Sequence, residues 1–219
     1  MLRLLFEKKG DAIWISHLDL MRLFQRAFKR AGLPLVHTQG FNPRPSVSIA
    51  LPLSVGVESC CELLDFELDG VNTSMEEICQ KLNTALIPDV RVLKVYDDGR
   101  KLRDLALLSC RLTMAYDHGI PDGAEAGITE LLSRETLIVD KRSKNGMQQQ
   151  DIIPMIHRFS VSSADEKTVI IDALVCCQNP SLNPMQLFAA IERYSAQWSP
   201  DFASCCRLEI FDTNEEIFR

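Results

Sequence analysis

The side chains with the clearest capacity for chemistry lie in the first fifty residues, where basic groups outnumber acidic ones. Residues 1–50 hold eight lysines and arginines against three acids, a net charge of +5. Residues 51–219 hold sixteen against twenty-seven, a net charge of −11. Charge separated in this way gives a local positive field that favours an anionic partner. The acidic chain as a whole, at −6, argues against indiscriminate nucleic-acid binding.

Four of these cations are predicted to share one side of a helix over residues 17–31. They are Arg22, Arg26, Lys29 and Arg30. At ~100° per residue they occupy roughly one quadrant, opposite an apolar side, with Asp19 among them. One acid leaves most of this face without an i,i+4 partner. The pattern indicates an anion-binding face, although a solvated helix face has the same periodicity.

A further cation, Arg44, follows the helix and lies between two prolines. Proline fixes its own φ and favours extended backbone in the residue before it, so we predict a stiff strut that presents Arg44. A guanidinium held in this way suits bidentate recognition of phosphate or carboxylate. Gly40 permits a left-handed turn or close approach of a ligand, and Phe41 could stack on a base or fill the core. We place Gly40, Phe41, Asn42 and Arg44 in the candidate anion or RNA site.

His17, at the predicted start of the helix, is the candidate catalytic residue and another candidate anion ligand. A helix N-terminus favours anions, and an imidazole there could act as a general base or contact a phosphate oxygen. A capping or packing role fits the same position. His37 follows in the neighbouring loop. The sequence has no Walker loop, GxGxxG, GxSxG or HExxH, so no motif names a reaction.

The eight cysteines do not form a recognisable metal motif. Six occur as adjacent pairs, and none has CxxC or CxxxCxxC spacing, so we predict no metal. A site assembled across strands from Cys110, Cys176 and Cys206 stays open. The chain start lacks the layout of a signal peptide, and no apolar run approaches the ~18–20 residues that span a bilayer. We therefore expect reduced thiols in a cytoplasmic protein.

The predicted strands and helices that hold these residues follow the same order in both halves of the chain. Residues 1–97 predict β-α-β-β-α-β, the ferredoxin-like motif, and residues 98–219 predict it again. We expect an α+β fold of two tandem ferredoxin-like halves with antiparallel sheets. In the first half, Ala12–Ile15 is predicted as a short extended piece. Ser46–Ser54 is predicted as an edge strand, because Pro52 cannot donate to a ladder.

In the second half, the predicted second strand is Leu137–Lys141 and the last is Arg207–Phe211. Between them, Arg142–Ser163 is predicted to be irregular. It includes a basic insertion near residues 141–151 with Lys141, Arg142 and Lys144.

Three runs in the first half resemble one known family closely. They are Ile15–Arg22 (ISHLDLMR), Arg26–Pro34 (RAFKRAGLP) and Gly40–Pro45 (GFNPRP). Ala50–Leu53, Gly56, Ser59, Glu62, and Ser143–Lys144 followed by Asp151–Ile152 also fit. The chain is similar to the radical SAM-linked (radical SAM-associated) proteins, a domain of unknown function found alone or fused behind a cobalamin-binding radical SAM enzyme. The adjacent pair Cys60 and Cys61 departs from that pattern.

The resemblance implies partnership with a radical SAM protein. S-adenosylmethionine, an iron–sulfur cluster and cobalamin would then belong to that partner, and this chain would bind no cofactor itself.

Three functions compete. The first is an accessory module that holds RNA, or an RNA-like anion, for the radical SAM enzyme. The second is an assembly subunit whose basic face docks on an acidic protein surface. The third is a metal-independent RNA-processing enzyme that uses His17 as base.

Overall fold

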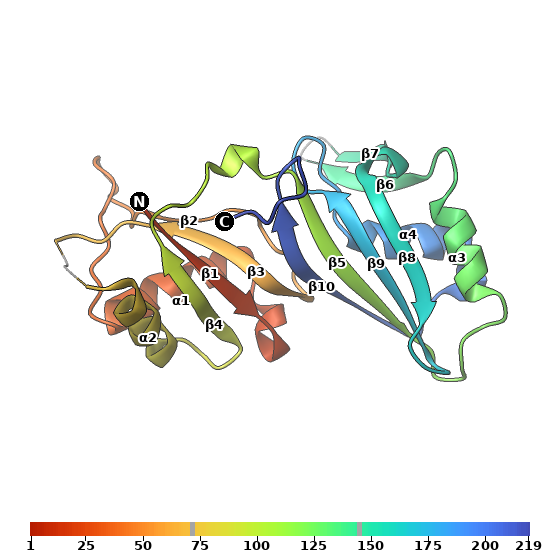
Figure 1. Cartoon of the computed structure of the whole chain (residues 1–219), viewed down its shortest axis with the longest axis horizontal. Helices are drawn as coiled ribbons and strands as arrows, with labels where there is room; N and C mark the ends of the chain where they lie inside the picture. Colours follow the sequence, from red (N-terminus) through yellow and green to blue (C-terminus); the bar gives the residue numbers. More distant parts are fainter. Residues whose placement is uncertain (71–72, 144–145) are drawn as a thin grey trace. The chain divides into compact units, whose positions relative to one another are not determined.

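The computed structural model describes residues 1–70, 73–143 and 146–219, without the side chains of residues 142 and 143 (Figure 1). The chain divides into two compact units, residues 1–104 together with Arg219, and residues 105–218. Both units combine helices with antiparallel strands, so the predicted α+β fold class is confirmed.

The first unit has the predicted β-α-β-β-α-β order. Its elements are β1 (Leu2–Lys8), α1 (His17–Arg30), β2 (Val47–Ile49), β3 (Val57–Phe66), α2 (Met75–Ala85) and β4 (Val90–Tyr96). The strands pair antiparallel in the order β4-β1-β3-β2. This is the ferredoxin-like motif, and it puts β2 at the sheet edge, as expected from Pro52.

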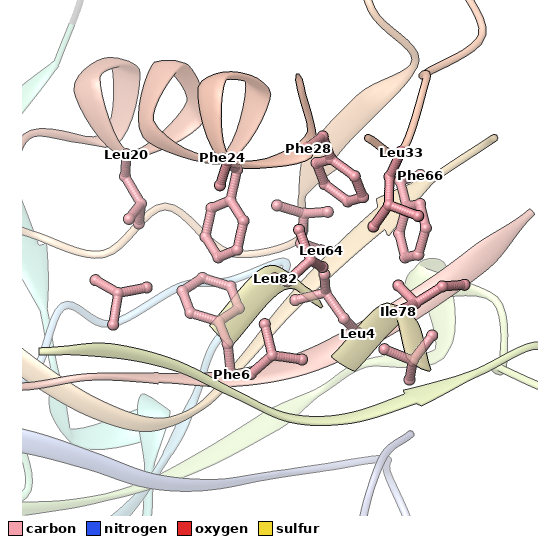
Figure 2. Packing of buried hydrophobic residues seen from close by; sticks show 14 of the residues in the cluster. Leu4, Phe6, Leu20, Phe24, Phe28, Leu33, Leu64, Phe66, Ile78 and Leu82 are labelled. Carbon is pink, nitrogen blue, oxygen red and sulfur yellow. The ribbon is translucent and has the colours of Figure 1, made fainter. Parts of the chain in front are cut away.

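Helix α1 is anchored to the sheet by aromatic contacts in the core of this unit (Figure 2). The rings of Phe6 and Phe24 meet edge to face with centroids 4.7 Å apart. Those of Phe28 and Phe66 lie 4.9 Å apart. Each fully buried Phe contributes about 1.5–3 kcal/mol relative to an exposed one. Because the apolar side of α1 is held against the sheet, its basic side must face solvent.

The start of α1 is capped by the side chain of Ser16. The Ser16 hydroxyl accepts from the backbone amide of Asp19 at 3.2 Å and donates to the Asp19 carboxylate at 2.7 Å. Two groups at the helix N-terminus are thereby satisfied, and the carboxylate complements the positive end of the helix dipole. The cap fixes where the helical face begins.

Two predictions for the first unit were wrong. Ala12–Ile15 is not extended, because Gly10–Trp14 forms a 3₁₀ turn that Asp89 holds through the amides of Lys9 and Asp11. The second strand covers only Val47–Ile49 instead of Ser46–Ser54. Pro52 lacks an amide hydrogen, so the ladder stops before it.

The outer strand β4 carries a side-chain clamp. The Asn83 amide nitrogen donates to the carbonyl of Val92 at 2.9 Å, and its amide oxygen accepts from the Val92 backbone amide at 2.8 Å. A residue of α2 thus satisfies both backbone groups of a residue in an edge strand. The clamp also ties α2 to the sheet.

The second unit repeats the motif with an insertion. Its elements are β5 (Leu107–Ala115), α3 (Ala124–Leu132), β6 (Ile138–Ser143), β7 (Gly146–Asp151), β8 (Ile156–Ser163), β9 (Thr168–Cys176), α4 (Met185–Tyr194) and β10 (Phe202–Phe211). The main sheet has the order β10-β5-β9-β8, all antiparallel. Strands β6 and β7 pair with each other as a separate hairpin.

Three predictions for this unit need correction. Leu137–Lys141 is a strand in the inserted hairpin, not the second strand of the main sheet. The true second strand, β8, lies inside Arg142–Ser163, where no strand was predicted; it is a polar edge strand whose serines resemble a loop. Strand β10 begins at Phe202 instead of Arg207, because its pairing with β5 extends to Ala115. Lys144 lies outside the described residues.

Helix α3 packs closely against the side chain of Trp198 at Gly127. A Cβ atom on Gly127 would lie 1.7 Å from the ring of Trp198. Only glycine fits there without displacing the indole.

All eight cysteines are free thiols, and four of them are buried.

Candidate anion-binding site in the first unit

The loop between α1 and β2 folds back on itself as a hairpin-like arm, here defined as residues 36–46. The Ser46 amide donates to the carbonyl of Val36 at 2.7 Å, and His37 and Pro45 form an antiparallel bridge. Further out, the Thr38 amide donates to the Arg44 carbonyl at 2.8 Å. The Thr38 hydroxyl accepts from the Arg44 amide at 3.0 Å. The predicted strut around Arg44 is therefore one side of a closed arm.

The tip of the arm is held away from the protein surface. Gly40 has a φ of +137°, which side-chain-bearing residues rarely adopt, so glycine is needed at this turn. Phe41 beside it is fully exposed, and Asn42 and Arg44 are exposed as well. Phe41 is therefore not part of the core, and its ring is available to a ligand.

Helix α1 and the base of the arm enclose a hollow of about 430 Å³, called here the basic hollow. The residues that line it are Gln25, Arg26, Phe28, Lys29, Leu33, Pro34, Leu35, His37 and Pro45. Its volume lies within the ~300–1,000 Å³ of small-ligand sites. The lining includes cations but no acid.

The cations at the basic hollow are not held in ion pairs, although the charge of Arg26 contributes to the lowered pKa of Asp19. Arg26 and Lys29 are exposed, and neither makes an ion pair with any residue in the described part of the chain. The Nδ1 atom of His37 lies 3.0 Å from the carbonyl oxygen of Leu35. Because a carbonyl only accepts, Nδ1 is the donor in this contact, and Nε2 makes no hydrogen bond in the described part of the chain.

Two of the predicted cations are engaged elsewhere. Arg22 pairs with Asp19 at 2.9 Å, and the pKa of Asp19 is lowered by hydrogen bonds from Ser16 and Arg22. Arg30 donates to the carbonyl of Ala85 and borders a different hollow with Lys81. Neither lines the basic hollow, which therefore joins only Arg26 and Lys29 of the predicted helical quadrant with the arm.

His17 is half-buried at the start of α1 and does not line the basic hollow. Its Nδ1 atom is buried without a hydrogen-bond partner among the described residues. Of the lining residues, sequence reasoning placed only Arg26 and Lys29 in the candidate site, and it missed Gln25, Phe28, Leu33, Pro34, Leu35 and Pro45. The bridge between His37 and Pro45 explains part of this, because it brings together residues eight positions apart. The two prolines that flank Arg44 were the available signal.

The second unit also has a hollow, but its charges are paired. Arg111 binds Asp172 through two hydrogen bonds of 2.8 and 2.9 Å, and Arg158 pairs with Glu215. Both arginines line a space of about 300 Å³ on the open face of the sheet. Since each has a carboxylate partner, this hollow is a weaker anion site than the basic hollow.

No group of three or more His, Cys, Asp or Glu side chains in the described residues could hold a metal ion. No helix in the same residues is long and apolar enough to cross a membrane.

The fold and the site together define an α+β protein with ferredoxin-like element order and a cationic hollow in its first unit. The chain belongs to a family of uncharacterized proteins conserved in bacteria (DUF2344), whose profile matches residues 1–184. No curated protein matches the chain.

Two solved structures match the chain, and one of these two has a similar overall fold. One is a chain in the crystal structure of a Cbf5–Nop10–Gar1 complex, with a TM-score of 0.51 and 8% identity over 95% of this chain and 48% of that chain. This chain therefore spans about half the length of that one, and at such low identity the likeness shows the fold alone. The other is an unknown protein from Galdieria sulphuraria, with a TM-score of 0.26 and 11% identity over 94% of this chain and 96% of that chain.

Proposed function

We propose that this protein is a binding module that holds RNA on the first unit, at the basic hollow and the arm. The observation that carries the proposal is that cations without an ion-pair partner and an exposed aromatic ring occur in the same part of the first unit. Arg26 and Lys29 border the basic hollow, and the arm that closes it presents Arg44 and Phe41. Cations that contact phosphates and aromatic rings that stack on bases are the usual parts of single-strand binding sites.

The negative net charge of the chain restricts the binding of a polyanion to this site. At −6 overall, most of the protein surface repels a polyanion, so attraction is confined to the basic part of the first unit. Neutralising a few phosphates releases counterions, which gives moderate and salt-sensitive affinity. Such affinity suits a module that must both bind and release its RNA.

The proposed partner is a radical SAM enzyme, on the strength of the sequence runs Ile15–Arg22, Arg26–Pro34 and Gly40–Pro45. In this arrangement the present chain positions the RNA, and the partner supplies the radical chemistry together with its cofactors. The two activities would be separable, since RNA binding rests on side chains of this chain alone.

The test is fluorescence anisotropy with a labelled single-stranded RNA of about twelve nucleotides. Arg26→Ala/Lys29→Ala should lose about ten-fold or more in affinity, at unchanged melting temperature. Arg91→Ala/Arg103→Ala removes the same charge from exposed positions of the same unit that do not line the hollow, and should bind like the natural protein. Equal losses in both double variants would indicate only general charge attraction, and the proposal would fail.

The partner is tested separately. Cross-linking followed by mass spectrometry should join the chain to a protein that carries a CxxxCxxC cluster motif. Cross-links that depend on Arg26 and Lys29 when RNA is absent would favour protein docking at this face instead.

A further inference from the structure

The basic hollow has two kinds of wall. One is apolar and consists of Phe28, Leu33, Pro34, Leu35 and Pro45. The other is polar and consists of Gln25, Arg26, Lys29 and His37. A site for phosphate alone needs only the polar wall. The apolar wall indicates that the ligand also brings a flat or hydrophobic group.

A nucleotide has both parts. Its phosphate would lie against Arg26 and Lys29, and its base against the prolines and Leu35. The Gln25 amide offers a donor and an acceptor to a base edge, and Nε2 of His37 offers a further polar contact. A stacked, paired base in a duplex cannot enter such a hollow, whereas an unpaired base can.

The arm extends the site beyond one nucleotide. Phe41 is four residues from both His37 and Pro45, so an extended backbone carries it at most ~14 Å from the base of the arm. Two neighbouring nucleotides of one strand can therefore contact the hollow and Phe41 together. Arg44, on the returning side of the arm, can contact a phosphate between them.

From these observations we infer that the ligand is a single RNA strand, with one unpaired base seated in the basic hollow and a neighbouring base stacked on Phe41. This inference rests on the proposed function and specifies its substrate class. It excludes duplex RNA and free nucleotides as the main ligands.

The first measurement compares three probes by anisotropy or competition. They are a labelled RNA strand of about twelve nucleotides, its blunt duplex with the complementary strand, and adenosine monophosphate. The strand should bind at least about ten-fold more tightly than either of the others. Duplex binding that equals strand binding, or mononucleotide binding that equals strand binding, would overturn the inference.

The second measurement tests each base contact with a matched control. Phe41→Ala should weaken strand binding by between about five-fold and one-hundred-fold, because it removes a stacking platform. Gln25→Ala and Pro34→Ser should each weaken it by about three-fold or more, as expected for one lost polar or apolar contact. Gln80→Ala and Pro88→Ser change exposed positions of the same unit and should have no effect. All five positions are outside the fully buried core, so the variants should fold.

The outcomes separate this inference from the proposed function. If strand and duplex bind equally and Arg26→Ala/Lys29→Ala abolishes both, the module binds RNA and the single-strand inference is wrong. If Phe41→Ala, Gln25→Ala and Pro34→Ser all bind the strand like the natural protein, the base does not occupy the hollow and the inference is also wrong. If no RNA probe binds, the proposed function itself fails.

Discussion

Thr38 and Arg44 are joined by two hydrogen bonds, one in each direction across the arm. The Thr38 amide donates to the Arg44 carbonyl, and the Thr38 hydroxyl accepts from the Arg44 amide, at 2.8 and 3.0 Å. The guanidinium of Arg44 is thereby carried on a backbone whose position is fixed relative to the opposite side of the arm. A contact made from such a backbone loses less conformational entropy on binding.

Thr38→Val should therefore weaken RNA binding without unfolding the protein. The substitution keeps the shape of the side chain but removes the hydroxyl that accepts from the Arg44 amide. We expect a loss of about three-fold to ten-fold in affinity, corresponding to one net hydrogen bond. Thr84→Val removes another exposed threonine hydroxyl, on α2, and serves as the control. Identical affinity of Thr38→Val and the natural protein would show that closure of the arm is not needed.

The salt dependence of binding should count the cations that contact phosphate. Arg26, Lys29 and Arg44 give three contacts, so log affinity should fall with log salt at a slope of roughly −2 for a single strand. Arg22→Ala should leave the slope unchanged, because Arg22 is held by Asp19. Arg26→Ala/Lys29→Ala should reduce the slope to about −0.7. A slope that is the same in all three proteins would contradict this assignment.

Ser16→Ala should destabilise the first unit by about 1 kcal/mol, the usual effect of losing an N-cap side chain. It removes the acceptor for the Asp19 amide and the donor to the Asp19 carboxylate. The pKa of Asp19 lies below its ordinary value of 3.8, so its stabilising contribution is present above that pH and is lost on further acidification. Urea unfolding at neutral pH and near pH 3 should show a smaller difference between the two proteins at the lower pH. Ser48→Ala, at an exposed position of β2, is the control.

The free energy of unfolding should begin to fall near pH 10. Burial raises the pKa of both Tyr96 and Tyr116 from 10.0 to about 12. Between these pH values the unfolded chain ionises its tyrosines while the folded chain keeps these two neutral, so stability falls as pH rises. In Tyr96→Phe, melting temperature should decline less steeply between pH 9.5 and 11.5 than in the natural protein. Parallel curves for the two proteins would exclude a contribution from Tyr96.

Gly127→Ala should destabilise the second unit despite the higher helix propensity of alanine. The added methyl would lie 1.7 Å from the Trp198 ring, so the indole or α3 must move, at about 1–3 kcal/mol or more. In a Trp14→Phe background, Trp198 fluorescence should shift to the red and the melting temperature should fall. Glu125→Ala, at an exposed position of the same helix, should leave the fluorescence of Trp198 unchanged.

The first unit was predictable from sequence because its signals are local. The Ser16 cap and the apolar side of α1 depend on neighbouring residues and indicate the helix correctly. Pro52 indicates the edge position of β2, although the strand itself is shorter than predicted. The second unit was harder, because strand β8 is stabilised by pairing with β9 and not by its own composition. The inserted hairpin β6–β7 supplied a more strand-like sequence nearby, and it was mistaken for part of the main sheet.

The sequence predicts which helix and loop form the candidate site, but not which of their residues line it. Periodicity places Arg22, Arg26, Lys29 and Arg30 on one side of α1, yet it cannot show that Asp19 and Ala85 engage two of them. Nor can it show that the arm closes at Thr38 and Arg44, since that depends on hydrogen bonds between residues six positions apart. Of the apolar wall, Leu33, Pro34 and Leu35 follow the helix directly and resemble ordinary helix-terminating sequence.

The clamp between Asn83 and Val92 bears on how this protein behaves at high concentration. An outer strand normally offers its backbone groups to strands of other molecules, which is the first step of edge-to-edge aggregation. At Val92 both groups are already taken by a side chain of the same unit. A single amide thus blocks intermolecular sheet growth at the middle of β4, and it acts beside Arg91 and Lys94, whose charges oppose edge-to-edge pairing in the same strand.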